Sequence, residues 1–93
     1  MIKNDRSRFH AYNIILAYES SGRQLKSVRN EYFNTNNLSS GERSRSMALS
    51  NEVVRWKRTL DNWIARSLKK PIQKLPLKVL CILRLGYYEY IMD

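Results

Sequence analysis

Glycine and proline are scarce in this sequence, which has only three glycines and two prolines among its 93 residues. The long stretches between them space their apolar residues at helical intervals and show little of the alternation that marks strands. Apolar residues make up 43% of the chain, which argues for a folded protein rather than a disordered one. The sequence therefore predicts one all-α domain over residues 1–93, large enough for a single core.

Cysteine is scarcer still, because Cys81 is the only one and no disulfide can form within the chain. Only Arg84 lies near enough in sequence to lower the pKa of its thiol, so a reduced, buried structural thiol is favoured over a nucleophile. The single histidine, His10, has no partner at metal-ligand spacing. The chain has no Gly-rich turn between a strand and a helix, where a cofactor could bind. It also has no pair of carboxylates that could serve as catalytic groups in its place. We therefore expect this chain alone to be no enzyme and to hold no cofactor and no metal.

Acidic residues are also few, since 8 Asp and Glu against 17 Lys and Arg give a formal net charge of +9. This balance indicates a polyanionic partner, nucleic acid first and an acidic membrane surface second. A membrane span is not expected, because Arg84 and Glu89 interrupt the apolar C-terminal segment before it reaches about 18 to 20 residues. No signal peptide opens the chain, so we expect a cytoplasmic protein.

The most apolar segment is residues 75–93, and we expect the other helices to be organised around a helix there. Apolar side chains cover most of its circumference and leave a narrow polar strip at Lys78, Leu85 and Glu89. A helix this apolar must be surrounded by other elements. The side chains expected to be covered are Val79, Leu80, Ile82, Leu83, Tyr87, Tyr90 and Ile91.

Two residues of this segment need a packing explanation. Gly86 in mid-helix costs about 1 kcal/mol relative to alanine, so we expect another helix to cross close to its backbone. Arg84 lies away from the polar strip, where an unpaired guanidinium would cost several kcal/mol. We therefore expect Arg84 to pair with an acid such as Asp61 or Glu19, rather than with RNA.

Two helices are expected before residue 35. The first runs from about residue 6 to 20 with Asn4 or Asp5 as its cap, and the second from about 24 to 33. The first helix is apolar on two sides, which predicts that it is clamped between two neighbours. One of these sides consists of Phe9, Tyr12, Asn13 and Leu16.

A long helical pattern follows, with room for one interruption, and reaches about residue 70. Ser39 and Glu42 have the spacing of a capping box at its start. Its core stripe spans an arc of about 100° under an ideal helical period. Both tryptophans belong to this stripe, so we expect them to pack in the core rather than to stack on bases. The stripe consists of Leu49, Val53, Trp56, Leu60, Trp63 and Ile64.

The opposite face of this long pattern forms a ridge with no carboxylate. A solvated face gains from pairing opposite charges, whereas a face of one sign is more easily explained by a phosphate backbone along it. Phosphate binding and an ordinary solvated face are the two interpretations. Lys70 and Lys74 add positive charge beyond the end of the ridge. The ridge consists of Asn51, Arg55, Arg58, Asn62, Arg66 and Lys69.

A second group of basic residues, Arg6, Arg8 and His10, lies at the start of the first helix. Cations there oppose the helix dipole, a cost that is tolerable if the site attracts anions. A solvated basic helix end is the alternative.

Four groups of residues occur in an order that resembles a known family. They are Arg8-x-x-Ala11 with Leu16; Leu38 followed by Glu42-Arg43; Leu49 with Val53-Val54-Arg55-Trp56 and Leu60-Asp61; and Ile82-Leu83-Arg84-Leu85-Gly86-Tyr87-Tyr88-Glu89-Tyr90. This order spans nearly all of the chain and resembles the NusB-like helical domain. The form is closest to the N-terminal domain of the RsmB-type (Fmu/Sun) ribosomal RNA cytosine-C5 methyltransferases.

The resemblance implies a NusB-like helical bundle of about five helices that binds RNA, most specifically ribosomal RNA. In the methyltransferases such a domain precedes an S-adenosylmethionine-dependent catalytic domain. In antitermination factors a similar fold binds a boxA RNA element together with a ribosomal protein, through basic residues at the start of its first helix. Those residues correspond to Arg6 and Arg8. With the ridge and its extension, the predicted RNA contacts are Arg6, Arg8, Arg55, Arg58, Arg66, Lys69, Lys70 and Lys74.

Three functions stay open on the sequence. The first is the substrate-RNA-binding domain of a 16S rRNA cytosine-C5 methyltransferase, in which case the parent protein would be an enzyme. The second is an antitermination or ribosome-biogenesis factor whose main partner is a protein. The third is a DNA-binding module, which would need a recognition helix with exposed polar side chains in the major groove.

The chain also departs from the family pattern. An aromatic residue is usual near Arg45 and a glycine near Glu52, and such domains typically continue for two helices after a motif like Tyr90-Ile91-Met92-Asp93. We therefore expect a truncated fragment or a short stand-alone relative. Absent helices would leave apolar surface on the C-terminal helix, which favours self-association into a homo-oligomer.

Overall fold

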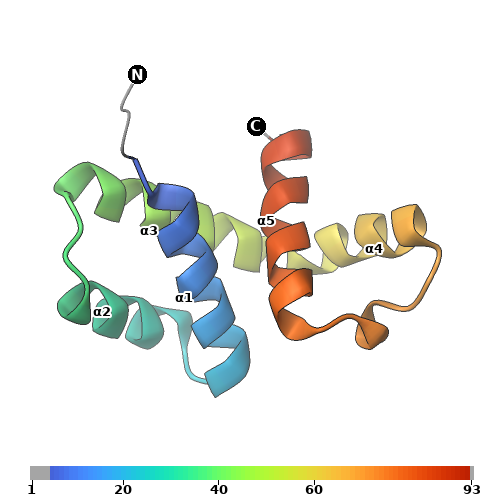
Figure 1. Cartoon of the computed structure of the whole chain (residues 1–93), viewed down its shortest axis with the longest axis horizontal. Coiled ribbons are helices and arrows are strands. Elements are labelled where there is room, and N and C mark those ends of the chain that lie inside the picture. The colour runs from blue at the N-terminus through green and yellow to red at the C-terminus, as the bar shows by residue number, and fades with distance from the viewer. Residues whose placement is uncertain (1–4, 93) are drawn as a thin grey trace.

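The computed structural model describes residues 5–92 and contains five α-helices and no strand within that range. This arrangement confirms the all-α class and the expected number of helices. Asn4, the alternative helix cap, and Asp93 lie outside the described residues. The helices, with the short 3-10 helix η1, are α1 (Ser7–Ser21), α2 (Leu25–Thr35), α3 (Ser40–Arg55), α4 (Lys57–Leu68), η1 (Ile72–Lys74) and α5 (Leu77–Met92) (Figure 1).

Local chemistry explains where several helices begin and end. Ser39 accepts a hydrogen bond from the Glu42 N–H at 3.1 Å while the Glu42 carboxylate accepts from the Ser39 N–H at 3.2 Å, which confirms the capping box of α3. Gly22 ends α1 with a φ of 70°, a left-handed conformation that glycine adopts without strain. The single interruption of the long pattern falls at Trp56, between α3 and α4.

Helix α1 lies between α2 and α5 and also contacts α3, so three helices cover it where its two apolar sides predicted two neighbours (Figure 1). The main core joins α1, α3, α4 and α5, and a smaller cluster joins α1 to α2 and to the loop before α3. Trp56 and Trp63 pack against the main core, in agreement with their predicted structural role. The buried residues are Ile15, Val53, Leu60, Cys81 and Leu85 in the main core and Ile14, Phe33 and Leu38 in the smaller one.

The predicted orientation of α5 is wrong. Leu85, which was assigned to the polar strip, is only 7% exposed, whereas Ile82 and Tyr90 are 56% and 88% exposed. A helix that is apolar on nearly all sides has no strongly preferred buried side, so its neighbours decide which side faces inward. Here α1 and α4 cover the side that carries Cys81 and Leu85.

Two predictions about individual residues of α5 have opposite outcomes. Gly86 is exposed, and no atom lies within 4 Å of the position that a Cβ would take, so the expected close helix crossing is absent. Arg84 is buried and pairs with both of the acids proposed for it, Asp61 and Glu19. The sequence therefore identified the electrostatic partners of this helix but not its open side.

Candidate nucleic-acid interface

The eight side chains predicted to contact RNA lie in two separate regions. Arg6 and Arg8 are at the start of α1, whereas the other six are at the end of α3, on α4 and in the connection to α5. These regions lie apart along the long axis of the molecule (Figure 1). The structure therefore does not gather all eight into one surface. The six are Arg55, Arg58, Arg66, Lys69, Lys70 and Lys74.

The region around α4 agrees with the predicted ridge only in part. Its six basic side chains are all exposed. At its α3 end, however, a Glu52 carboxylate oxygen lies 3.7 Å from Arg55, and Asn51 accepts a hydrogen bond from Arg29 at 2.6 Å. The break at Trp56 separates this end from α4. The ridge is therefore less continuous and less uniformly basic than its sequence indicated.

A hollow of about 530 Å³ lies at the start of α1. Arg6 and Arg8 of α1 and Arg45 of α3 line it, and the ring of Phe9 forms part of its wall. Carboxylates line it too, so its electrostatic character depends on what those carboxylates bind. The remaining lining residues are Asp5, Ser7, Leu49 and Glu89.

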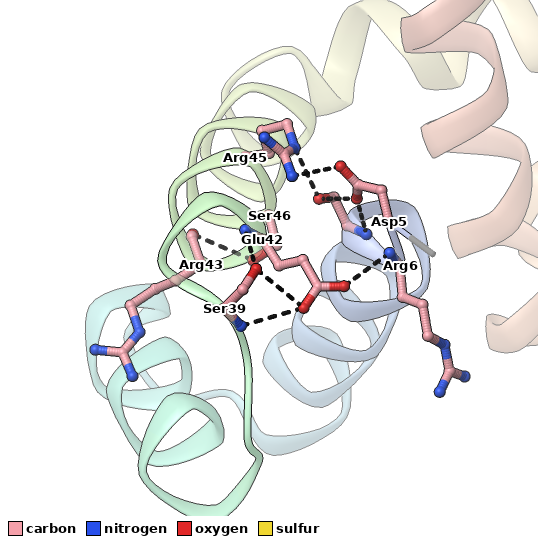
Figure 2. A network of polar contacts seen from close by, with 8 residues as sticks. Asp5, Arg6, Ser39, Glu42, Arg43, Arg45 and Ser46 are labelled. Carbon is pink, nitrogen blue, oxygen red and sulfur yellow. Dashed lines mark hydrogen bonds and ion pairs between the residues drawn. The ribbon is translucent and has the colours of Figure 1, made fainter. Parts of the chain in front are cut away.

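Asp5 is occupied by contacts within the protein (Figure 2). Its carboxylate accepts from the Ser7 N–H at 2.8 Å and from the Ser7 hydroxyl, and it forms an ion pair with Arg45 at 2.5 Å. Arg45 Nε also donates to Ser7 Oγ at 3.2 Å. The hydrogen bonds from Ser7, and after them the charge of Arg45, hold the pKa of the Asp5 carboxyl below its ordinary value. The prediction of Asp5 as the helix cap is wrong by one residue, because Arg6 occupies the N-cap position without a side-chain cap hydrogen bond and Asp5 precedes it.

Glu42 ties the start of α1 to the start of α3 (Figure 2). Its carboxylate accepts from the Arg6 backbone N–H at 2.9 Å as well as from Ser39. These two backbone N–H groups hold the pKa of Glu42 below its ordinary value. The Arg6 side chain points away from this contact, and its guanidinium lies 4.2 Å from the centre of the Phe9 ring.

The third carboxylate of this region, Glu89 of α5, lies 2.6 Å from Nε of Arg8. Arg8 nevertheless stays largely exposed to solvent. Every carboxylate that lines the hollow is therefore engaged by an arginine or a serine of the same region. The guanidinium of Arg6 is the one that makes no ion pair with any residue in the described part of the chain.

Sequence reasoning missed Arg45 and Phe9 as members of this region. Arg45 meets Asp5 and Ser7 across 38 or more residues of chain, so no local spacing signals the contact. Phe9 was expected on a covered side of α1, but it is 46% exposed. His10, which the sequence grouped with the arginines, is buried, and its Nδ1 lies 2.6 Å from the Tyr32 hydroxyl. It therefore belongs to the contact between α1 and α2.

A second concave surface lies between α4 and α5 and has a volume of about 700 Å³. Its lining is mostly apolar, and Arg66 is its only charged member. The open side of α5 faces this groove, which agrees with the expectation of exposed apolar surface on the C-terminal helix. We call it the α4–α5 groove, and its lining residues are Trp63, Arg66, Ser67, Ile82, Leu83, Gly86, Tyr87, Tyr90 and Ile91.

The described residues offer few other kinds of site. Over residues 5–92 no three or more His, Cys, Asp or Glu side chains gather where they could hold a metal ion. In the same range no helix is both long enough and apolar enough to span a bilayer.

Small all-α domains with a basic helix start include several nucleic-acid-binding classes, and comparison with family models identifies the class here. The NusB family model matches residues 5–93, so the chain belongs to the NusB family. NusB-type domains are non-catalytic RNA-binding folds. Comparison with curated proteins and with solved structures gave no match.

Proposed function

We propose that this NusB-family domain binds RNA at the start of α1, and that the RNA is ribosomal RNA held for a cytosine-C5 methyltransferase domain of the same parent protein. The observation that carries the RNA-binding part is the arginine-lined hollow. Its carboxylates pair with Arg8 and Arg45, the guanidinium of Arg6 lies against the Phe9 ring, and all three arginines border the same hollow. Arginine in such a position suits the planar, two-point recognition of phosphate.

The basic side chains on and beyond α4 extend the proposal to a longer RNA. Arg58, Arg66 and Lys69 are exposed and make no ion pair within residues 5–92, so they remain available to neutralise phosphates. Because this region lies apart from the hollow, one short RNA would not contact both. A structured RNA with two backbone segments would reach the two regions together.

The test is a titration of the protein with single-stranded RNA, structured rRNA fragments and duplex DNA at two salt concentrations. We expect RNA to bind more tightly than DNA and its affinity to fall steeply with salt. Each neutralised phosphate of a single strand adds about 0.7 to the steepness of log K against log salt. The charge reversals Arg6→Glu with Arg8→Glu should weaken binding to all RNA sequences alike.

Matched variants separate the two regions. Arg55→Glu with Arg58→Glu should lower the affinity for structured rRNA more than the affinity for a short single strand. Arg23→Glu is the control, because Arg23 lies near the opposite end of α1 from the hollow and is an exposed arginine that pairs with Glu31 as Arg8 pairs with Glu89. Absence of binding to any RNA at low salt would contradict the proposal, and tighter binding of duplex DNA would favour the DNA-binding alternative.

The methyltransferase assignment has its own test. We expect the reading frame that encodes this chain to continue into an S-adenosylmethionine-binding domain, which sequencing of the parent gene determines. A frame that ends without such a domain would contradict this part and leave the RNA-binding part unchanged.

A second candidate function is supported by the α4–α5 groove. Ile82 and Tyr90 expose apolar surface there, which suits a factor that acts on RNA together with a protein partner or as a homo-oligomer. Ile82→Lys should then abolish the complex and leave RNA affinity unchanged. Light scattering of the purified chain distinguishes self-association from binding of another protein.

A further inference from the structure

The outer face of α4 carries two arginines that no carboxylate of residues 5–92 neutralises. Arg58 and Arg66 are exposed, lie about two turns apart, and form no ion pair within this range. Asp61 is the only acid of α4, but it is mostly covered and held by the buried guanidinium of Arg84. The exposed face of α4 is therefore positive along its length.

An uncharged polar side chain, Asn62, lies between these arginines. At about 100° per residue, Arg58, Asn62 and Arg66 share an arc of about 80° on the helix. Asn62 is exposed, and its side chain makes no hydrogen bond to any other described residue. Its amide can both donate and accept a hydrogen bond, so it suits a ligand that offers hydroxyl groups between two anionic groups.

The backbone at the end of α4 is strained at a lysine. Lys69 follows the helix with φ 55° and ψ 34°, and it is the only non-glycine residue with positive φ within residues 5–92. At the end of α1 the same left-handed region is occupied by Gly22, which adopts it without strain. The helix dipole favours a cation here, but Arg66 and Lys70 already supply one. A strained lysine in place of glycine therefore points to a function of its side chain.

The exposed face of α4 is made of cations and an amide, not of aromatic rings. Trp56 and Trp63, its nearest tryptophans, are partly buried and pack against the main core. Cations contact the phosphate backbone, which a duplex presents on two strands and at higher charge density than a single strand does. An RNA duplex also displays its 2′-hydroxyls in a wide, shallow minor groove that side chains can reach.

We infer that α4 binds double-stranded RNA across its minor groove, with Arg58 and Arg66 on phosphates and Asn62 at the 2′-hydroxyls between them. The two arginines are about 12 Å apart along the helix axis, so they reach separate phosphates. Lys69 contacts the backbone beyond the end of the helix. This inference rests on the proposed function and adds a site for the paired parts of a structured RNA.

Duplex DNA shares only part of these contacts. Its phosphates can meet the same cations, but it has no 2′-hydroxyls and its minor groove is narrow. The ionic contacts are therefore common to both duplexes, whereas the contact of Asn62 is specific to RNA. A single strand of RNA has no groove to lie across, so it depends on the separate hollow at the start of α1.

The test measures binding of the whole chain to three labelled probes at several salt concentrations. The probes are an RNA duplex, a DNA duplex of the same sequence, and a single RNA strand of the same length. Arg58→Gln with Arg66→Gln should lower the salt slope for the RNA duplex by about two, because two phosphate contacts are lost. Lys26→Gln is the control, since Lys26 is exposed on α2, away from α4 (Figure 1). It should leave the slope unchanged.

Asn62→Ala tests the choice of RNA over DNA. We expect it to lower the affinity for the RNA duplex by about two-fold to ten-fold, the usual effect of losing one neutral hydrogen bond. The affinity for the DNA duplex and both salt slopes should stay the same, because no charge is removed. An equal loss for the two duplexes would overturn the contact with the 2′-hydroxyls.

Two variants of Lys69 separate binding from folding. Lys69→Gly should raise the melting temperature by a few degrees, because glycine adopts this conformation without strain, and should lower the affinity for the RNA duplex. Lys69→Gln removes the charge but keeps the strain, so it should lower the affinity to the same extent without the thermal gain. If Lys69→Gly is more stable and binds the duplex like the original chain, the assigned contact of Lys69 is wrong.

The inference and the proposed function fail in different ways. If Arg58→Gln with Arg66→Gln leaves duplex binding unchanged while Arg6→Glu with Arg8→Glu weakens the single strand, RNA binding stands and the site on α4 is wrong. An RNA duplex that binds no more tightly than the DNA duplex would also overturn the site. If the original chain binds neither form of RNA at low salt, both are overturned.

Discussion

The guanidinium of Arg84 and the carboxylate of Asp61 form a two-point hydrogen bond that joins α5 to α4. Nε donates to Oδ1 at 2.7 Å and Nη2 donates to Oδ2 at 2.9 Å. Only 5% of the Arg84 side chain and 16% of the Asp61 side chain are exposed. Nη1 lies 3.3 Å from Glu19 but without hydrogen-bond geometry, and Glu19 also pairs with Lys57 at 3.0 Å. Asp61 is therefore the main partner of this buried charge.

Replacing Asp61 should strongly lower the urea concentration at which the protein unfolds. Asp61→Asn keeps the shape and leaves Arg84 without its main counter-charge, which typically costs about 3–5 kcal/mol. The exposed pair of Arg23 and Glu31 is the comparison, where Glu31→Gln should cost about 0–1 kcal/mol.

A double variant tests the same ion pair by removing both of its charges. Arg84→Met combined with Asp61→Leu removes both charges, and buried ion pairs replaced by apolar residues are often neutral in stability. We expect the double variant to be more stable than Asp61→Asn alone. The opposite order would show that packing, and not the unpaired charge, dominates this site.

Acid should loosen the contact between the starts of α1 and α3. The pKa values of Asp5 and Glu42 lie below their ordinary values of 3.8 and 4.5 in the folded state. The unfolded chain therefore binds protons at higher pH than the folded chain does. The stability that these carboxylates contribute is fully present above their ordinary pKa values and is lost as pH falls through the lowered ones.

Urea unfolding measured at several values between about pH 6 and about pH 3 checks this expectation. Asp5→Asn and Glu42→Gln should each show a weaker dependence of the unfolding free energy on pH than the original chain. An unchanged dependence in both variants would mean that other carboxylates cause the acid sensitivity.

Gly86→Ala should stabilise the protein. Gly86 lies within α5, and no atom is near enough to obstruct a Cβ, so alanine gains helix propensity of roughly 0.5–1 kcal/mol. Gly22→Ala is the matched comparison and should destabilise, because a φ of 70° is strained for alanine. Thermal unfolding of the two variants checks both signs. Destabilisation by Gly86→Ala would mean that the groove is closed in solution.

Cys81 should react slowly with thiol reagents in the folded protein. Burial raises the pKa of the thiol, which keeps it protonated at neutral pH, and its side chain is fully covered. Reaction with a disulfide reagent should become fast in urea. Fast reaction without denaturant would show that α5 separates from the core.

Part of the candidate interface could be read from the sequence, and part could not. Arg6 and Arg8 were identified from local charge and from the family resemblance. The contribution of Arg45 depends on Asp5, which comes from a distant part of the chain, and the exposure of Phe9 depends on which sides of α1 its neighbours cover. Neither the long-range contact of Arg45 nor the exposure of Phe9 produces a periodic pattern in the sequence, so neither could be predicted from it.

The sequence by itself determined the elements that depend on neighbouring residues. The helical class, the capping box of Ser39 and Glu42 and the single break in the long pattern all follow from local hydrogen bonding and backbone preference. It also indicated the partners of Arg84, because a buried cation needs an acid and few acids were suitably placed.

The tertiary structure alone decided which side of α5 is buried. Leu85 faces the core and Ile82 faces the groove, although a helical periodicity pattern counts both residues as apolar. The free energy of burying an apolar side chain does not depend on direction, so a helix that is apolar nearly all round can turn either side inward. The covering helices α1 and α4, and the ion pair of Arg84 with Asp61, select the orientation that the protein adopts.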